Sequence, residues 1–348
     1  VDKTSANYAV DTKNPTVTGV VAGDALLTDG DVGPGKQTIT VSFSEAMDKT
    51  APPTLGFDPA VLTTLTPDGA GGVWSDDKTY TVTYTVADGG VEAKDIKVGV
   101  TGAKDAAGNA QAAYTPSAAF SVDTQNPTVT SIALSDAALK VGETATVTVS
   151  FSEAVSGFDA ADVSAPSGTL SAFKVDTQDA TKYTATFTPT ADVEAGTNVI
   201  TLTAASSGIA DLAGNALAVD KTSANYAVDT KNPTVTIGDD QSGMVTDANR
   251  ATPVLYTLQF GEEVKDFTAD DVTVSGGVAN DFTKLDGDTY TVKVTADDGY
   301  EGPIAVTVKK DGFTDLNGNV FVADVSDSAQ AVDTKNPTVT IGDDQSGM

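Results

Sequence analysis

The sequence predicts an all-β protein made of three tandem β-sandwich domains. The nonapeptide Val-Asp-Thr-x-Asn-Pro-Thr-Val-Thr begins at Val10, Val122, Val228 and Val332, and its aspartates lie 112, 106 and 104 residues apart. Each interval is long enough for one domain with its own core. Within the intervals, apolar residues alternate with period two, and no sustained helical pattern competes. Short strands separated by turn residues indicate a two-sheet sandwich of about seven strands in each interval.

The nonapeptide aspartates set the predicted boundaries. They define unit 1, unit 2 and unit 3, with a short segment on either side: residues 11–122, 123–228 and 229–332, flanked by 1–10 and 333–348. Residues 1–18 recur letter for letter at 219–236, and residues 228–244 recur at 332–348. We therefore expect residues 1–10 to be a partial last strand of an upstream repeat and residues 333–348 a partial first strand of a downstream repeat. Both ends should be less ordered than the middle.

The predicted strands recur in the same order in each unit. Each unit has an early, a middle and a late apolar run, followed by a last strand that leads into the next nonapeptide. In units 1, 2 and 3 the early run is 39–43, 147–151 and 254–260, the middle run is 80–86, 183–187 and 290–294, and the late run is 96–100, 200–202 and 304–308. Phe120 and Tyr226 precede the nonapeptide in units 1 and 2, whereas unit 3 has Gln330 there. We expect this glutamine to loosen the last strand of unit 3.

Composition excludes several classes of function. The chain has 49 acidic and 20 basic residues, a formal net charge of -29, and neither histidine nor cysteine. This charge disfavours nucleic acid as a partner. Without histidine or cysteine there is no Ser-His-Asp triad, thiol nucleophile or disulfide, so we expect no enzyme. No apolar run reaches 18 residues, so we expect no membrane insertion in this segment.

Two further motifs recur at fixed places. Phe-Ser-Glu-Ala follows the early strand at 43–46 and 151–154, with Phe-Gly-Glu-Glu at 260–263. Asp-x-x-Gly-Asn precedes the last strand at 105–109, 211–215 and 315–319. The glutamates and aspartates of the two motifs are 60, 58 and 53 residues apart, which is far in sequence, but both motifs lie at strand ends.

The run FSEAV, the loop DLAGN and the hinge VDT..PTVT resemble the tandem bacterial immunoglobulin-like repeats of large biofilm-associated and RTX-type adhesins. The resemblance covers essentially the whole chain. It implies immunoglobulin-like Greek-key β-sandwich domains in an extended array, secretion to the bacterial cell surface, and a stalk whose interdomain junctions bind calcium. The glycine-rich RTX nonapeptide itself is absent, and unit 1 has Met47-Asp-Lys-Thr-Ala-Pro-Pro53 in place of the Phe-x-x-x-Asp-Val of residues 158–163 and 267–272.

The topology of such a sandwich predicts where carboxylates meet. The nonapeptide, the loop after the second strand and the loop before the last strand share one pole, here called the proximal pole. The carboxylates predicted to converge there are Asp11, Glu45 and Asp105; Asp123, Glu153 and Asp211, with Asp162 as a fourth; and Asp229, Glu262, Asp271 and Asp315. The opposite, distal pole faces the next nonapeptide and carries a second acidic set: Asp88 and Glu92; Asp192 and Glu194; and Asp297, Asp298 and Glu301.

Carboxylates gathered in this way repel one another unless a cation or protons neutralise them. Calcium fits best, because it takes six to eight oxygen ligands in flexible geometry, whereas zinc prefers histidine or cysteine. Each motif also has a purely structural interpretation: Asp-x-x-Gly-Asn is a good turn, and Asp-Thr-x-Asn-Pro is an ordinary Asx turn before proline. Their joint recurrence favours the calcium interpretation.

We therefore predict a structural extender of a secreted bacterial adhesin: a monomeric rod whose partners are its own neighbouring repeats and whose cofactor is Ca²⁺. The alternative is that one repeat is itself a carbohydrate- or protein-binding module. Unit 1 is the best candidate, because Trp74 and the Pro52-Pro53 loop occur only there. An exposed tryptophan could stack on a sugar, and a buried one would argue against this alternative.

Overall fold

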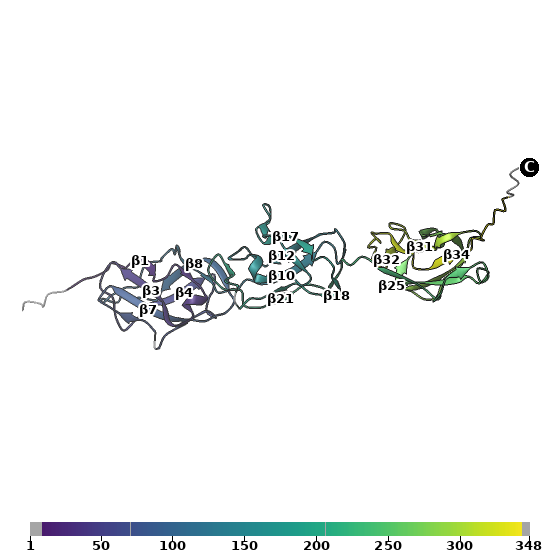
Figure 1. The fold of residues 1–348 in the computed structure, drawn as a ribbon. Helices are drawn as coiled ribbons and strands as arrows, with labels where there is room; N and C mark the ends of the chain where they lie inside the picture. The colour runs from purple at the N-terminus through teal and green to yellow at the C-terminus, as the bar shows by residue number, and fades with distance from the viewer. Residues whose placement is uncertain (1–8, 70, 206, 343–348) are drawn as a thin grey trace, which may run out of the picture.

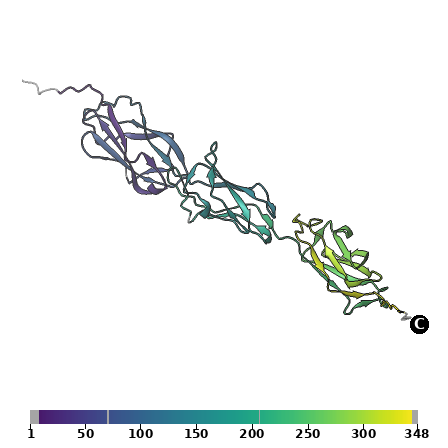
Figure 2. The ribbon, with the colours of Figure 1, turned by 45° about the horizontal axis from the view of Figure 1, so that its top comes forward.

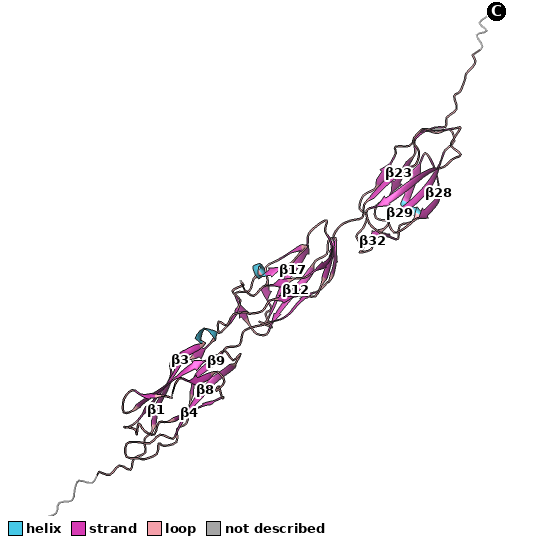
Figure 3. Ribbon diagram, turned by 90° about the horizontal axis from the view of Figure 1, so that it is seen from below, coloured by secondary structure: helices cyan, strands magenta, loops and turns pink. Residues whose placement is uncertain are grey.

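The computed structural model describes residues 9–69, 71–205 and 207–342. Three β-units follow one another along a line, with the first and third at opposite ends (Figure 1, Figure 2 and Figure 3). The prediction of an all-β chain is confirmed, because the only helices in the described residues are 3-10 turns: η1 (Asp29–Asp31), η2 (Ala160–Asp162) and η3 (Ala269–Asp271). The expected disorder of the ends falls largely on residues 1–8 and 343–348, which lie outside the described residues.

Unit 1 is a sandwich of two sheets. The first has the order β1-β3-β7-β5, with β6 also on β7, and the second has the order β2-β9-β8-β4. Its strands are β1 (Val17–Ala22), β2 (Leu26–Leu27), β3 (Gly33–Phe43), β4 (Thr54–Asp58), β5 (Leu65–Pro67), β6 (Val73–Trp74), β7 (Thr79–Val86), β8 (Glu92–Thr101) and β9 (Ala118–Asp123).

Unit 2 repeats this plan with its second layer divided into short sheets. The main sheet has the order β10-β12-β17-β15, with β16 on β17, and the other layer contains β11-β22-β18, β14-β19-β21 and the pair β13-β20. Its strands are β10 (Val129–Leu134), β11 (Ala138–Lys140), β12 (Ala145–Phe151), β13 (Val155–Ser156), β14 (Val163–Ser164), β15 (Gly168–Leu170), β16 (Lys174–Val175), β17 (Lys182–Pro189), β18 (Glu194–Asn198), β19 (Thr201–Leu202), β20 (Ala210–Asp211), β21 (Lys221–Thr222) and β22 (Tyr226–Asp229).

Unit 3 follows unit 2 closely. Its main sheet is β23-β25-β29-β28, and the other layer contains β24-β34-β30, β27-β31-β33 and the pair β26-β32. Its strands are β23 (Val235–Asp239), β24 (Val245–Thr246), β25 (Val254–Phe260), β26 (Val264–Lys265), β27 (Val272–Ser275), β28 (Gly277–Lys284), β29 (Thr289–Ala296), β30 (Glu301–Pro303), β31 (Ala305–Val308), β32 (Thr314–Asp315), β33 (Val325–Asp327) and β34 (Ala331–Asp333).

Each unit has one hydrophobic core formed by the alternating residues of its strands. In β7, for example, exposure alternates residue by residue, so that Tyr80, Val82, Tyr84 and Val86 are buried. This is the pattern of strands with one face on a core. Gln330 does not have the loosening effect that we expected: it is buried, its amide donates to the carbonyl oxygen of Gly243 at 2.9 Å, and β34 pairs on both sides.

The first strand of every unit is shared between the two layers. In unit 1, β1 pairs antiparallel with β3, and β2 then crosses to pair parallel with the last strand, β9. The strands β11 and β24 pair parallel with β22 and β34 in the same way. As a result, the second part of the first strand lies beside and parallel to the last strand, on which the chain leaves the unit.

Candidate functional site: the carboxylates at the joints

The structure brings the predicted proximal-pole carboxylates together in two of the three units. We call the three sets trio 1, trio 2 and trio 3: Asp11, Glu45 and Asp105; Asp123, Glu153 and Asp211; Asp229, Glu262 and Asp315. In trio 1 and in trio 3, one carboxylate oxygen from each residue lies within 4.8 Å of the others. Among the described residues, trio 2 is not drawn together this closely.

A repeated strand pairing positions each trio. The residue two positions after the glutamate pairs with the aspartate of Asp-x-x-Gly-Asn, as in Val155 with Asp211 and Val264 with Asp315. Met47 and Asp105 form the same bridge in unit 1. The pairing holds the glutamate-bearing segment beside the Asp-x-x-Gly-Asn loop, although the two motifs are more than fifty residues apart.

The aspartate of Asp-x-x-Gly-Asn organises its own turn. Asp211 is only 3% exposed, and its Oδ1 accepts the amide N–H groups of Ala213, Gly214 and Asn215 at 2.8, 2.7 and 2.9 Å. Asp315 accepts the corresponding amides of Asn317 and Asn319, both at 2.8 Å. Such hydrogen bonds satisfy the acceptor oxygen of a buried carboxylate. The structural interpretation of the motif therefore holds alongside any role in metal binding.

The linker aspartates form the expected Asx turns. Oδ1 of Asp123 accepts the N–H of Gln125 at 3.3 Å, and Oδ1 of Asp229 accepts that of Lys231 at 3.2 Å. In unit 3, the side-chain amide of Asn317 also donates to Oδ2 of Asp229. Each Asx turn uses one carboxylate oxygen of its linker aspartate, and at Asp229 the amide of Asn317 uses the other.

In trios 2 and 3, burial and neighbouring negative charges oppose the ionisation of three carboxyl groups, those of Asp123, Glu153 and Glu262. Burial, followed by the charges of Asp315 and Asp229, raises the pKa of Glu262 to about 7. Burial, followed by the charge of Asp211, raises the pKa of Glu153, and burial also raises that of Asp123. In trio 1, the Oε1 atom of Glu45 is buried without a hydrogen-bond partner among the described residues. Carboxylates in this state gain from a cation, and an all-oxygen donor set suits Ca²⁺.

The distal pole contributes one glutamate to each joint. Strand pairing places Glu92 opposite Asp123, Glu194 opposite Asp229, and Glu301 opposite Asp333. The charge of Glu92 raises the pKa of both Asp123 and Glu153. The predicted meeting of distal acids with the next linker aspartate therefore takes place through neighbouring strands.

A lysine, which sequence reasoning did not select, accompanies each distal glutamate. Lys231 Nζ lies 4.0 Å from Glu194, and Lys335 Nζ lies 3.6 Å from Glu301, both from the variable position of the nonapeptide. That position is Gln125 at the first joint, where Lys94 of β8 approaches Glu92 at 2.7 Å instead. A lysine therefore lies beside the distal glutamate in all three units, but it comes from β8 in unit 1 and from the following nonapeptide in units 2 and 3.

The remaining predicted acids lie near the joints without joining a trio. The Oδ2 atoms of Asp162 and Asp271 accept the N–H groups of Asp159 and Thr268, both at 2.8 Å, and cap the turns η2 and η3. Four acids are on exposed distal loops: Asp88, Asp192, Asp297 and Asp298. Of these, Asp298 lies 3.5 Å from the guanidinium of Arg250.

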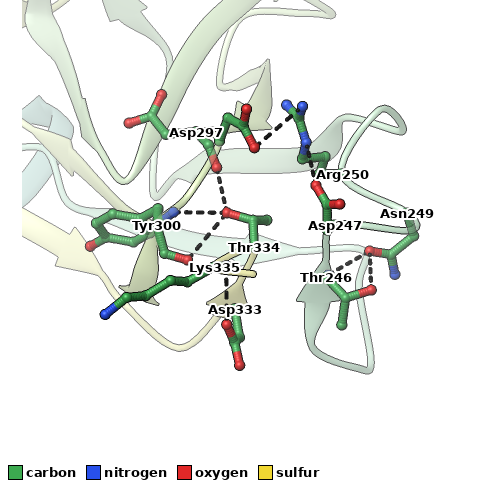
Figure 4. Close-up of polar contacts among 10 residues, drawn as sticks. Thr246, Asp247, Asn249, Arg250, Asp297, Tyr300, Asp333, Thr334 and Lys335 are labelled. Atoms are coloured by element: carbon green, nitrogen blue, oxygen red, sulfur yellow. Dashed lines mark hydrogen bonds and ion pairs between the residues drawn. The ribbon is translucent and has the colours of Figure 1, made fainter. Parts of the chain in front are cut away.

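The threonine of the nonapeptide fastens the linker to the distal pole. Figure 4 shows this at the end of unit 3, where the hydroxyl of Thr334 donates to the carbonyl oxygen of Asp297 at 2.7 Å and accepts the N–H of Tyr300 at 2.9 Å. Thr230 makes the same pair of bonds to Thr190 and Val193. The sequence shows that Thr recurs in every nonapeptide, but it does not show which backbone groups the hydroxyl binds.

The asparagine that ends Asp-x-x-Gly-Asn forms a hydrogen bond across the joint, from its own unit to the preceding unit. Asn215 Oδ1 accepts the backbone N–H of Asp29 in unit 1 at 2.9 Å, and Asn319 Oδ1 accepts that of Val141 in unit 2 at 2.8 Å. The first joint also forms an open pocket of about 540 Å³, lined by both units: Leu26, Glu92, Lys94, Asp95, Ser121, Val122, Asp123, Glu153, Ala154, Leu212 and Ala213. Two members of trio 2, Asp123 and Glu153, therefore face this pocket.

Trp74 is not placed for stacking on a ligand. Its ring centroid lies 5.1 Å from that of Tyr80 and 5.8 Å from that of Phe43, and its side chain is partly buried against the core of unit 1. The indole Nε1 atom is buried as well. This packing argues against a sugar-binding role for the tryptophan. No helix in the described part of the chain has the length and apolar character needed to cross a bilayer.

Comparisons with known proteins bear on the family. Among solved structures, the N-terminal eight Ig domains of the Down Syndrome Cell Adhesion Molecule match at 12% identity and a TM-score of 0.33, covering 93% of this chain and 37% of that chain. Invasin, a bacterial integrin-binding protein, matches at 15% identity and a TM-score of 0.32, covering 89% of this chain and 59% of that one. The chain thus spans less than two thirds of either. No curated protein sequence matches.

A family model described as a bacterial Ig-like domain matches residues 123–228 and 229–332. Together the two matches cover more than half of the chain, and unit 1 has the same arrangement of first, early and last strands. The fold predicted from the sequence is therefore confirmed as a tandem array of immunoglobulin-like β-sandwiches, and the chain belongs to the bacterial Ig-like domain family.

Proposed function

We propose that this segment is an extender of a bacterial cell-surface adhesin, which holds a distal binding region away from the cell. The observation that carries the proposal is the linear succession of three immunoglobulin-like units (Figure 3), in which units 2 and 3 each form a hydrogen bond from the Asp-x-x-Gly-Asn loop to the preceding unit. Each unit is about a hundred residues long, so a tandem array gains reach with every repeat. Secretion to the cell surface and a part in biofilm formation follow from the same role.

Calcium at the joints is the second part of the proposal. It is supported by the close carboxylates of trios 1 and 3, by the raised pKa of Glu262, and by the buried unpaired oxygen of Glu45. A divalent cation would remove the mutual repulsion of each trio, whose carboxylates come from the linker and the following unit, and the distal glutamate of the preceding unit lies opposite the linker aspartate. Sites of this kind in extracellular modules bind calcium at roughly 0.1 to 1 mM. The joints would then be stiff in calcium-rich surroundings.

Small-angle scattering on the whole chain, with and without chelator, tests the proposal. We expect calcium to narrow the distribution of shapes and lengthen the average particle, and titration calorimetry to detect calcium uptake. Glu262→Gln should remove the uptake attributable to trio 3, whereas Glu263→Gln should not, since Glu263 is the exposed next residue. Unchanged scattering together with no heat of calcium binding would exclude calcium as the stiffening agent.

A further inference from the structure

We propose that the asparagine of each Asp-x-x-Gly-Asn loop is a docking residue that locks its unit to the preceding one through a direct hydrogen bond, independently of any cation. The inference rests on the proposed function only in taking the array to be an extended one. Both joints show the same contact, from Asn215 to Asp29 and from Asn319 to Val141. The two donors occupy equivalent places, two residues beyond Leu27 in unit 1 and beyond Leu139 in unit 2.

The orientation of the amide is fixed by its other bonds. Nδ2 of Asn215 donates to Oδ2 of Asp211 and to the carbonyl oxygen of Asp123, both at 2.9 Å. Nδ2 of Asn319 donates likewise to Asp315 at 2.8 Å and to the carbonyl oxygen of Asp229 at 3.0 Å. Only an NH₂ group can serve two acceptors in this way, so the amide oxygen must face the neighbouring unit. The asparagine therefore links the turn, the linker and the preceding unit.

The burial of both asparagine side chains supports a specific contact between the units. Asn215 is fully buried and Asn319 is 2% exposed, although both lie at the end of a unit. A buried amide oxygen needs a donor, and here the preceding unit supplies it. Aspartate could not substitute, because it would lose both donated bonds and add a charge beside the trio. Asparagine is the side chain that fits an acceptor toward one unit and two donors toward the other.

A pair of substitutions at Asp29 isolates the effect of the N–H donor. Asp29 is the first residue of η1, where proline is tolerated because its φ suits the turn, and Thr28 before it is extended, with ψ at -179°. Asp29→Pro deletes the N–H that reaches Asn215. Asp29→Ala is the matched control, because it removes the same carboxylate and keeps the N–H. The chain has no cysteine, so spin labels can be attached at chosen sites.

The measurement is a set of distances between spin labels on the full chain in chelator. Labels at Thr66→Cys and Lys174→Cys span the first joint, and labels at Lys174→Cys and Thr273→Cys span the second. A net hydrogen bond corresponds to roughly a three- to tenfold change in the ratio of docked to undocked joints. We expect Asp29→Pro to broaden the first distance by that loss, to leave the second unchanged, and Asp29→Ala to broaden neither. Equal widths for Asp29→Pro and Asp29→Ala would overturn the proposal.

A second measurement covers the case in which the proline variant does not fold. Hydrogen exchange at the Asp29 amide should be slow in the wild type and faster in Asn215→Ala by roughly the same factor. Asn109→Ala is the control, because Asn109 makes the same donations to Asp105 and Asp11 but lies outside both joints. An Asp29 amide that exchanges at one rate in all three proteins would overturn the proposal. Repeating the distances in calcium tests the metal separately, since a calcium effect should persist in Asp29→Pro.

Discussion

Replacing Glu262 by glutamine tests the electrostatics of trio 3. Burial and the charges of Asp315 and Asp229 raise the pKa of this carboxyl from 4.5 to about 7. One pKa unit corresponds to about 1.4 kcal/mol, so ionising Glu262 in the folded unit would cost about 3 kcal/mol without screening. Glu262 is partly exposed, and we expect solvent to reduce this cost to about 1–2 kcal/mol.

The pH dependence of stability follows from the direction of the shift. Because the folded-state pKa of Glu262 is the higher one, the destabilising cost is absent below pH 4.5 and complete above about pH 7. In chelator, wild-type unit 3 should therefore lose stability as the pH rises through this range. Glu262→Gln should avoid that loss, so that it is more stable than the wild type by about 1–2 kcal/mol near pH 8 and equal to it at low pH. In calcium the order should reverse, because an amide is the weaker ligand.

Urea unfolding followed by hydrogen exchange and mass spectrometry, on peptides from β25 and β29, isolates the response of unit 3. Glu263→Gln is the matched control, since Glu263 is the adjacent exposed residue. The reasoning is refuted if Glu263→Gln changes stability as much as Glu262→Gln does. It is also refuted if Glu262→Gln gains nothing at high pH in chelator.

Three further substitutions test other parts of the joints and the core. Thr230→Val leaves Val193 N–H without its hydroxyl acceptor and should destabilise unit 2 by about 1–3 kcal/mol in urea unfolding, whereas exposed Thr236→Val should stay within about 0.5 kcal/mol of the wild type. Trp74→Ala should destabilise unit 1 by about 2–3 kcal/mol and Trp74→Phe by clearly less, as followed by circular dichroism; equal losses would show that the aromatic packing is unimportant. Lys94→Gln should raise calcium affinity at the first joint several-fold in calorimetry, because a competing positive charge is removed beside Glu92; lower affinity would contradict this.

Much of the trio geometry could be predicted from the sequence. Glu262 and Asp315 are 53 residues apart, but one follows the early strand and the other precedes the last strand of a sandwich, so topology brings both to one pole. Periodicity and the repeated motifs gave the order of the strands, and the immunoglobulin-like topology implied by the family resemblance gave the shared pole. The same reasoning placed Glu194 near Asp229, which the structure pairs directly.

The hydrogen bonds that cross the joints could not be predicted. The contact from Asn215 to Asp29 joins residues 186 positions apart in different units, and it depends on the path of the linker to within a fraction of an ångström. No local pattern encodes such a distance. The larger separation of the carboxylate oxygens in trio 2 could not be predicted either, because the residue types of trio 2 match those of trios 1 and 3.

The sharing of the first strand between two layers has a mechanical consequence. Tension along the array pulls the first strand of each unit in one direction and its last strand in the opposite direction. Because β2 and β9 are parallel neighbours, as are β11 with β22 and β24 with β34, this force slides the paired strands past each other and loads their hydrogen bonds together. A hairpin pulled at its open end would instead break one bond at a time. Each unit is thus built to resist stretching along the long axis of the array.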